Sequence, residues 1–231
     1  MSAITILLAF LPGFAWLFFY LEEDPHPEPK RLIFLTFIAG AIAAIAAFVV
    51  QVIINNLGID QKISVLGFPR TGTIAMLLAF AAVEEIAKFG GAYFAIHKNP
   101  DFDEPTDAMI YMIVAALGFA TVENIGVLYS AQDGASVLWG PALQTISFRF
   151  VGATLLHAIS SGLVGYYWAK AVRNFESGKW IVWGLIAASG LHMLFNYLIL
   201  IYGNLIYPLM LVVIAGLFIL GDFEELKREN V

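Results

Sequence analysis

Seven long apolar segments are the feature that most limits what this chain can fold into. They cover residues 2–21, 32–54, 73–96, 108–130, 143–172, 180–202 and 205–220. A helix that crosses the hydrocarbon core of a bilayer needs about 20 such residues. The chain is 60% hydrophobic and 13% charged, whereas soluble domains carry about 25% charged residues. The sequence therefore predicts an all-α, polytopic membrane bundle of about seven transmembrane helices.

Charge and composition exclude several partners and ligands. A net charge of −6 argues against nucleic-acid binding, which needs a basic face for the phosphates. The chain contains no cysteine, so a metal ion would have to be held by His, Glu or Asp. We expect residues 1–221 to form a single transmembrane domain in the lipid bilayer, and residues 222–231 to form a loose, charged cytoplasmic tail.

The distribution of basic residues predicts the orientation. With seven spans, one side of the membrane carries eight basic residues and the other side carries Lys62 and Arg70. The eight are Lys30, Arg31, Lys98, Lys170, Arg173, Lys179, Lys227 and Arg228. Because short cytoplasmic loops are enriched in Lys and Arg, we expect the N-terminus outside and the C-terminus in the cytoplasm.

Seven ionisable residues fall inside the predicted spans, where each charged group costs roughly 2.5–3.5 kcal/mol near the bilayer centre. They are Glu84, Glu85, Lys88, Glu123, Arg149, His157 and His192. Such residues should face the bundle interior and either pair or act in chemistry. Counting residues from the span ends, at 1.5 Å of rise each, places Glu84, His157 and His192 near the membrane centre. We therefore expect these three side chains to converge.

The spacing of the other charges suggests specific partners. Glu123 and Arg149 match in depth on consecutive spans, so we expect an ion pair, which serves either structure or the wall of an active site. Lys88 follows Glu84 by four residues and Glu85 by three, so it shares a helix face with either carboxylate. It would neutralise that carboxylate or hold it ionised as a base.

Two further spacings bear on the site. Adjacent glutamates point about 100° apart on a helix, so we expect one of Glu84 and Glu85 to face the site and the other a neighbouring helix. His192 and Asn196 lie one turn apart, which puts an imidazole and an amide donor on one face.

Several chemistries lack their motifs. The sequence contains neither the H-E-x-x-H pattern of zinc proteases nor the G-x-S-x-G turn of serine hydrolases. All aspartates, including Asp107 and Asp222, are interpreted as loop or tail residues, which argues against a two-aspartate membrane protease. Ser160-Ser161-Gly162 and the alanine-rich segment 39–47 are interpreted as small residues that let helices pack closely.

Five segments, in order along most of the chain, resemble the PrsW-type intramembrane peptidases, relatives of the CAAX prenyl endopeptidases and bacteriocin-processing proteins. They are Asp24-Pro25-His26-Pro27-Glu28-Pro29, Glu84-Glu85-Ile86-Ala87-Lys88 (E-E-x-x-K), Gly118-Phe119-Ala120-Thr121-Val122-Glu123-Asn124, the stretch from Arg149 to His157, and His192-Met193-Leu194-Phe195-Asn196. The resemblance implies that residues 1–221 are one peptidase domain in a prokaryotic cell membrane. The implied substrate is a membrane-anchored protein, such as a single-span anti-sigma factor cut in a site-1-type step.

The resemblance also implies residue roles. Glu84 becomes the water-activating base, with Glu85 close by as the alternative. His157 and His192 would bind water or a metal ion, and Asn196 would donate to the oxyanion. Lys88, Glu123, Asn124 and Arg149 would support the site. Zinc held by Glu84, His157 and His192 with an open fourth position, and direct activation of water by Glu84 without metal, both remain open.

Two other functions compete with hydrolysis. The same fold can serve as a non-catalytic membrane scaffold whose buried charges only pair. Intramembrane Glu and His residues also form proton relays in transporters, although the sequence shows no internal repeat of the kind found in transporters.

The orientation is open to a direct test. A reporter fused after Val231 should read as cytoplasmic, because the eight-to-two bias in basic residues places that end inside. Paired alkaline-phosphatase and fluorescent-protein fusions measure this. A reading on the outer side would refute the count of seven spans.

Overall fold

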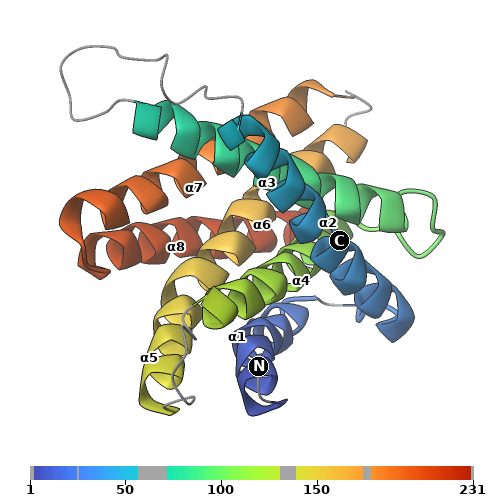
Figure 1. Ribbon diagram of the computed structural model, residues 1–231. Coiled ribbons are helices and arrows are strands. Elements are labelled where there is room, and N and C mark those ends of the chain that lie inside the picture. Colours follow the sequence, from blue (N-terminus) through green and yellow to red (C-terminus); the bar gives the residue numbers. More distant parts are fainter. Residues whose placement is uncertain (1–2, 25, 57–71, 131–138, 174–177, 230–231) are drawn as a thin grey trace.

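The described part of the chain consists of helices joined by short connections (Figure 1). The computed structural model describes residues 3–24, 26–56, 72–130, 139–173 and 178–229. The helices are α1 (Ala3–Leu21), α2 (Lys30–Asn56), α3 (Gly72–Ile96), α4 (Pro105–Ser130), α5 (Trp139–Arg149), α6 (Leu155–Arg173), α7 (Lys179–Tyr202) and α8 (Ile206–Glu229), with a π-helical turn, Phe150–Thr154, joining α5 to α6. No strand occurs among these residues, so the prediction of an all-α fold is confirmed.

Five helical segments within the described residues are long and apolar enough to cross a membrane. They are Lys30–Asn56, Pro105–Ser130, Leu143–Arg173, Lys179–Tyr202 and Ile206–Arg228. α1 contributes a shorter apolar helix, Ile6–Leu21. α3 has the length but carries Glu84, Glu85 and Lys88 at its centre, which lowers its hydropathy. The architecture is that of a multi-pass membrane protein in which the charged helix α3 must be shielded by its neighbours.

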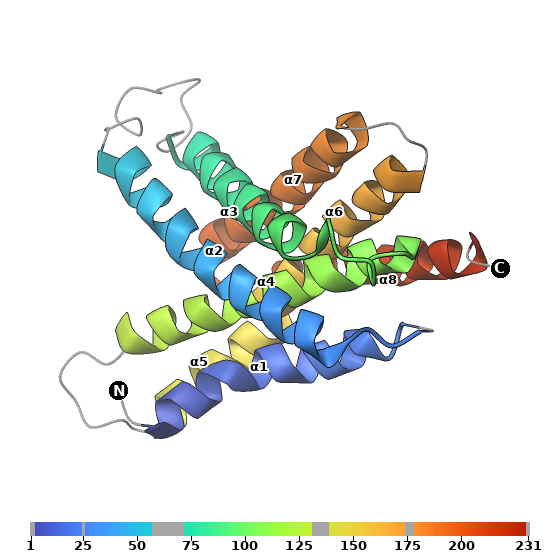
Figure 2. The ribbon, with the colours of Figure 1, turned by 90° about the vertical axis from the view of Figure 1, so that its right-hand side faces the viewer.

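α4 is the central helix of the bundle. Every residue from Thr106 to Thr121 is buried, because α1, α2, α3 and α6 all pack against it. In Figure 2, α2 crosses α4, and α3 and α7 lie on the far side of that crossing from α1. α7 and α8 are the more peripheral helices, with large apolar side chains such as Trp183 and Leu217 exposed to the surroundings.

Glycines allow α2 and α4 to cross at backbone contact. A Cβ atom built on Gly40 would lie 1.9 Å from the carbonyl oxygen of Ala115, and one on Gly118 would lie 2.0 Å from that of Phe37. Neither position can accept a side chain. Ala43, Ala44 and Ala47 continue the contact around Phe119, which confirms that the segment 39–47 serves close helix packing.

The prolyl segment between α1 and α2 docks on the start of α4. Tyr111 donates a hydrogen bond to Glu28, and His26 Nδ1 lies 2.7 Å from Glu104 Oε1. Burial raises the pKa of Glu28 to about 8, even though the hydrogen bond from Tyr111 acts in the opposite direction. This acidic, proline-spaced motif therefore fixes the angle at which α2 leaves α1.

Two boundary predictions are wrong. The expected loose tail after residue 221 instead continues α8 to Glu229, because Phe223 and Leu226 are buried and Lys227 pairs with Glu23 at 2.7 Å. Asp107 and Asp222 are not loop or tail residues, since the first lies in the first turn of α4 and the second in α8. Neither forms a hydrogen bond or ion pair with Glu84 or Glu85 among the described residues.

The fifth predicted span is interrupted by the π-helical turn. α5 begins at Trp139, four residues before the predicted start, and Phe150–Thr154 then adopts the wider turn. The side chain of Trp16 donates a hydrogen bond to the carbonyl oxygen of Phe150 at 2.8 Å. π-turns inside helices are frequent at functional sites, and here the turn lies between Arg149 and His157.

The crossing of α2 and α4 predicts a large difference between two glycine variants. Gly40→Ala should destabilise the protein by about 1–3 kcal/mol or more, because overpacking forces the helices apart. Gly90→Ala is the matched control, since a Cβ there meets nothing within 4 Å, and it should be neutral or stabilising by up to about 1 kcal/mol through helix propensity. Thermal unfolding in detergent measures both. Equal melting temperatures for the two variants would contradict this packing.

Candidate active site

A fully buried ion pair forms the centre of the site. Glu85 and Lys88 each have 0% of their side chain exposed, and Lys88 Nζ lies 2.7 Å from Glu85 Oε1. Glu85 also accepts hydrogen bonds from Ser160 at 2.9 Å and Ser161 at 3.2 Å, and lies 2.9 Å from His192 Nδ1. This carboxylate therefore joins α3 to both α6 and α7.

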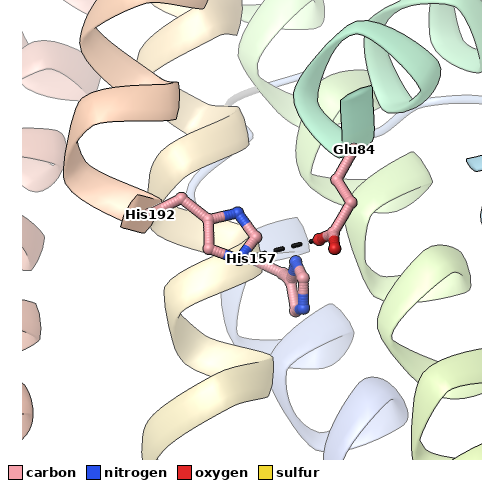
Figure 3. A group of neighbouring side chains, drawn as sticks. All are labelled: Glu84, His157 and His192. Atoms are coloured by element: carbon pink, nitrogen blue, oxygen red, sulfur yellow. Dashed lines mark ion pairs between the residues drawn. The ribbon is translucent and has the colours of Figure 1, made fainter. Parts of the chain in front are cut away.

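Glu84 and His192 present unused acceptor atoms to each other. His192 Nδ1 donates to the Glu85 carboxylate, so in the neutral imidazole Nε2 carries the free lone pair. That nitrogen lies 3.6 Å from Glu84 Oε2, a buried oxygen without a hydrogen-bond partner. Figure 3 shows the two side chains meeting from α7 and α3 with His157 of α6 beside them. Two buried acceptors at this separation can share one water molecule, which would donate a hydrogen bond to each.

His157 has both ring nitrogens engaged. Lys88 Nζ lies 2.9 Å from its Nδ1, and a lysine ammonium only donates. Its Nε2 therefore carries the proton and donates to Glu123 Oε2 at 2.8 Å. The predicted ion pair is present, since Arg149 Nη2 lies 3.1 Å from the same oxygen of Glu123.

Asn124 is the last residue in a series of hydrogen-bonded side chains that includes His157, Glu123 and Arg149. Its amide oxygen accepts from Arg149 Nε, and its amide nitrogen donates to the carbonyl oxygen of Ala9 at 3.2 Å. The chain of contacts from Lys88 through His157 and Glu123 to Arg149 thus ends on the backbone of α1. It holds the imidazole of His157 in one orientation.

The structure brings together most of the predicted site residues. Glu84, His157 and His192 converge, with one potential ligand atom from each lying within 4.8 Å of the others. Both glutamates contact His192. Lys88 pairs with Glu85, a choice between the two glutamates that the sequence spacing left open. Asn196 forms no hydrogen bond to this cluster among the described residues, so its role as oxyanion donor stays a prediction.

Three contributing residues were missed or misread. Ser160 and Ser161 are hydrogen-bond donors to Glu85 and not merely packing residues. They lie three and four residues after His157, so the shared helix face was a signal. Gln51 of α2 donates from Nε2 to Glu84 Oε1 at 2.8 Å, and an amide inside an apolar span was the only signal for it.

The donor set fits a zinc-type ion in part. Glu84 Oε2 and His192 Nε2 both offer free lone pairs, and Glu85 orients His192 in the way that carboxylates orient metal-bound histidines. His157 can supply the third nitrogen only by giving up its contact with Lys88 or Glu123. Two ligands are therefore ready, and the third must exchange a hydrogen bond.

Comparison with known proteins identifies the family. The family model described as "PrsW family intramembrane metalloprotease" matches residues 28–220. The chain belongs to the PrsW family. Its relatives include Protease PrsW of Geobacillus kaustophilus, 28% identical over 82% of this chain and 76% of the relative. Protease PrsW of Bacillus subtilis is 25% identical over 86% and 84%, and that of Halalkalibacterium halodurans is 27% identical over 91% of each chain. No solved structure matches.

Membership of the PrsW family decides between the classes of function. The chain is an intramembrane peptidase and a multi-pass integral membrane protein. The resemblance carried by the five motifs is confirmed, and peptide hydrolysis is favoured over the scaffold and transporter alternatives.

The buried ion pair predicts strong coupling between two substitutions. Lys88→Met should destabilise the protein by about 3–5 kcal/mol, because it leaves the Glu85 carboxylate buried and uncompensated. The double variant Glu85→Gln with Lys88→Met removes both charges at similar volume and should recover most of this loss. Thermal unfolding of the two variants in detergent measures the difference. If the double variant is as unstable as Lys88→Met, the loss of stability does not come from the unpaired charge of Glu85, and the prediction is wrong.

Proposed function

We propose that the chain hydrolyses a peptide bond of a membrane-anchored protein with a water molecule held between Glu84 and His192. The observation that carries this proposal is the pair of facing acceptors, Glu84 Oε2 and His192 Nε2, buried and 3.6 Å apart. A water that donates to both keeps its own lone pairs directed away from them, toward an incoming carbonyl carbon.

The steps follow from these contacts. Glu84 Oε2 takes a proton as the water oxygen bonds to the peptide carbon, and the carbonyl oxygen becomes an oxyanion. Asn196, one turn beyond His192 on α7, is the proposed donor to that oxyanion. The C–N bond then breaks, and the proton on Glu84 passes to the leaving nitrogen to give an amine and a carboxylic acid.

The neighbouring residues hold the side chains of Glu84 and His192 in position. Glu85 holds the Nδ1 proton of His192, which makes Nε2 the acceptor of the neutral imidazole. Gln51 occupies the other oxygen of Glu84 and leaves only Oε2 for the water. If a zinc-type ion binds, Glu84, His192 and His157 would hold it, and it would polarise the water and the carbonyl.

The substrate and setting are part of the same proposal. Peptide bonds of an intact membrane helix are shielded by their own hydrogen bonds, so the scissile segment must unwind. We propose a single-span protein of the anti-sigma-factor kind as the substrate, cut in a bacterial cell membrane. Support comes from the family resemblance and the bacterial relatives.

Substitution of the proposed base tests this function. Glu84→Gln should reduce cleavage by about 10²–10⁴-fold, the usual contribution of a general base, while the melting temperature stays close to that of the wild type. Cleavage of a single-span reporter in proteoliposomes measures the loss. Glu224→Gln is the matched control, because Glu224 is exposed on α8, and it should retain full activity. A Glu84→Gln variant with wild-type turnover would refute the assignment of the base.

Metal analysis of the same preparations separates the two forms of the mechanism. The ion is assigned to this site if the wild type contains one equivalent of zinc and loses activity in chelator, and if His192→Ala has lost both the zinc and the activity. A metal-free preparation that remains active in chelator would assign water activation to Glu84 and His192 alone.

A further inference from the structure

A cavity of about 280 Å³ lies between α2 and α4, directly beside the site. In Figure 2 the two helices diverge from their crossing toward the ends that carry Asn56 and Ser130. Gln51 and Glu123 line this cavity, and each contacts the catalytic cluster, the first through Glu84 and the second through His157. The cavity is therefore separated from Glu84 by one hydrogen bond, through Gln51, and from His157 by another, through Glu123.

The mouth of the cavity faces the lipid. Ile45 is 58% exposed and Phe48 is 65% exposed at its rim. Gly126 forms part of the opposite wall, and a Cβ built there meets nothing within 4 Å. A chain segment in the bilayer can thus reach the site sideways, without passing through water.

The lining of the cavity favours a bound segment with small side chains. The inner wall is made of the small side chains of Ala44 and Ala47. An unwound segment with small side chains fits this space.

The polar end of the cavity supplies what an unwound segment needs. Extended backbone in a membrane must find hydrogen-bond partners outside itself. The Gln51 amide uses one N–H on Glu84, and its carbonyl oxygen has no partner among the described residues. That oxygen can accept from a substrate N–H next to the reacting carbonyl.

We infer that this groove binds the unwound stretch of the substrate's membrane segment, entering from the lipid between α2 and α4, with Gln51 joining the bound backbone to Glu84. The inference rests on the proposed hydrolase function and adds to it the route and the conformation of the substrate.

Cysteine cross-linking tests the route, because the chain contains no cysteine. Phe48→Cys at the groove and Leu217→Cys on α8 are matched in exposure, at 65% and 66%. Each is placed in the Glu84→Gln background and oxidised with a single-span test protein that carries one cysteine, stepped along its apolar segment. Disulfide formation requires Cα atoms about 4.4–6.8 Å apart. Cross-links should form through Phe48→Cys near the bond that wild-type enzyme cleaves, and not through Leu217→Cys.

A steric variant gives a second, independent readout. Gly126→Leu adds a side chain to the groove at a position where a Cβ meets nothing within 4 Å, and it should raise KM at least tenfold without lowering the melting temperature. Gly221→Leu, at another glycine whose Cβ would meet nothing within 4 Å, should behave as wild type. Suppose that the wild type cleaves the test protein but both cysteines cross-link equally, or that Gly126→Leu leaves KM unchanged. Either result would refute the proposed groove and leave the hydrolase function standing. Absence of wild-type cleavage of every single-span test protein would overturn the hydrolase function on which the groove rests.

Discussion

The buried pair of Glu85 and Lys88 is the constraint on which the rest of the structure depends. Two opposite charges with no exposed surface are tolerable in a membrane bundle only when every remaining hydrogen-bonding position is filled. Ser160, Ser161 and His192 fill those positions on Glu85, and His157 takes a further bond from Lys88. Satisfying this one pair therefore fixes α6 and α7 against α3, and it does so at the depth where the two imidazoles are needed.

Close packing elsewhere sets the shape of the space around that pair. The contact of Gly40 and Gly118 with facing backbone brings α2 and α4 together at one point, and the helices can only separate on either side of it. On the side of Asn56 and Ser130 the separation leaves the groove next to Gln51 and Glu123. Small residues at the crossing and a cavity beyond it are thus two consequences of the same helix geometry.

The sequence predicted the elements of this architecture better than their connections. Apolar length placed all seven predicted segments on helices, the fifth divided between α5 and α6, but only five described segments are long and apolar enough to cross a membrane. Matched depth was enough to find the pairing of Glu123 with Arg149. The choice of Glu85 as the partner of Lys88 was not predictable, since spacings of three and four residues are equivalent on a helix. The π-helical turn after Arg149 and the continuation of α8 past residue 221 depend on tertiary contacts, such as those of Trp16 and Phe223, which no local pattern records.

The two adjacent glutamates show how environment separates roles that sequence leaves equal. Glu85 has both oxygens engaged, so it has little capacity to bind a water or accept a proton, and it serves as an anchor. Glu84 has one oxygen held by Gln51 and the other left unpartnered in a buried position. No side chain of the described residues donates to this second oxygen, and it faces Nε2 of His192. That position can therefore hold the attacking water of the proposed hydrolysis, which the Glu85 carboxylate cannot.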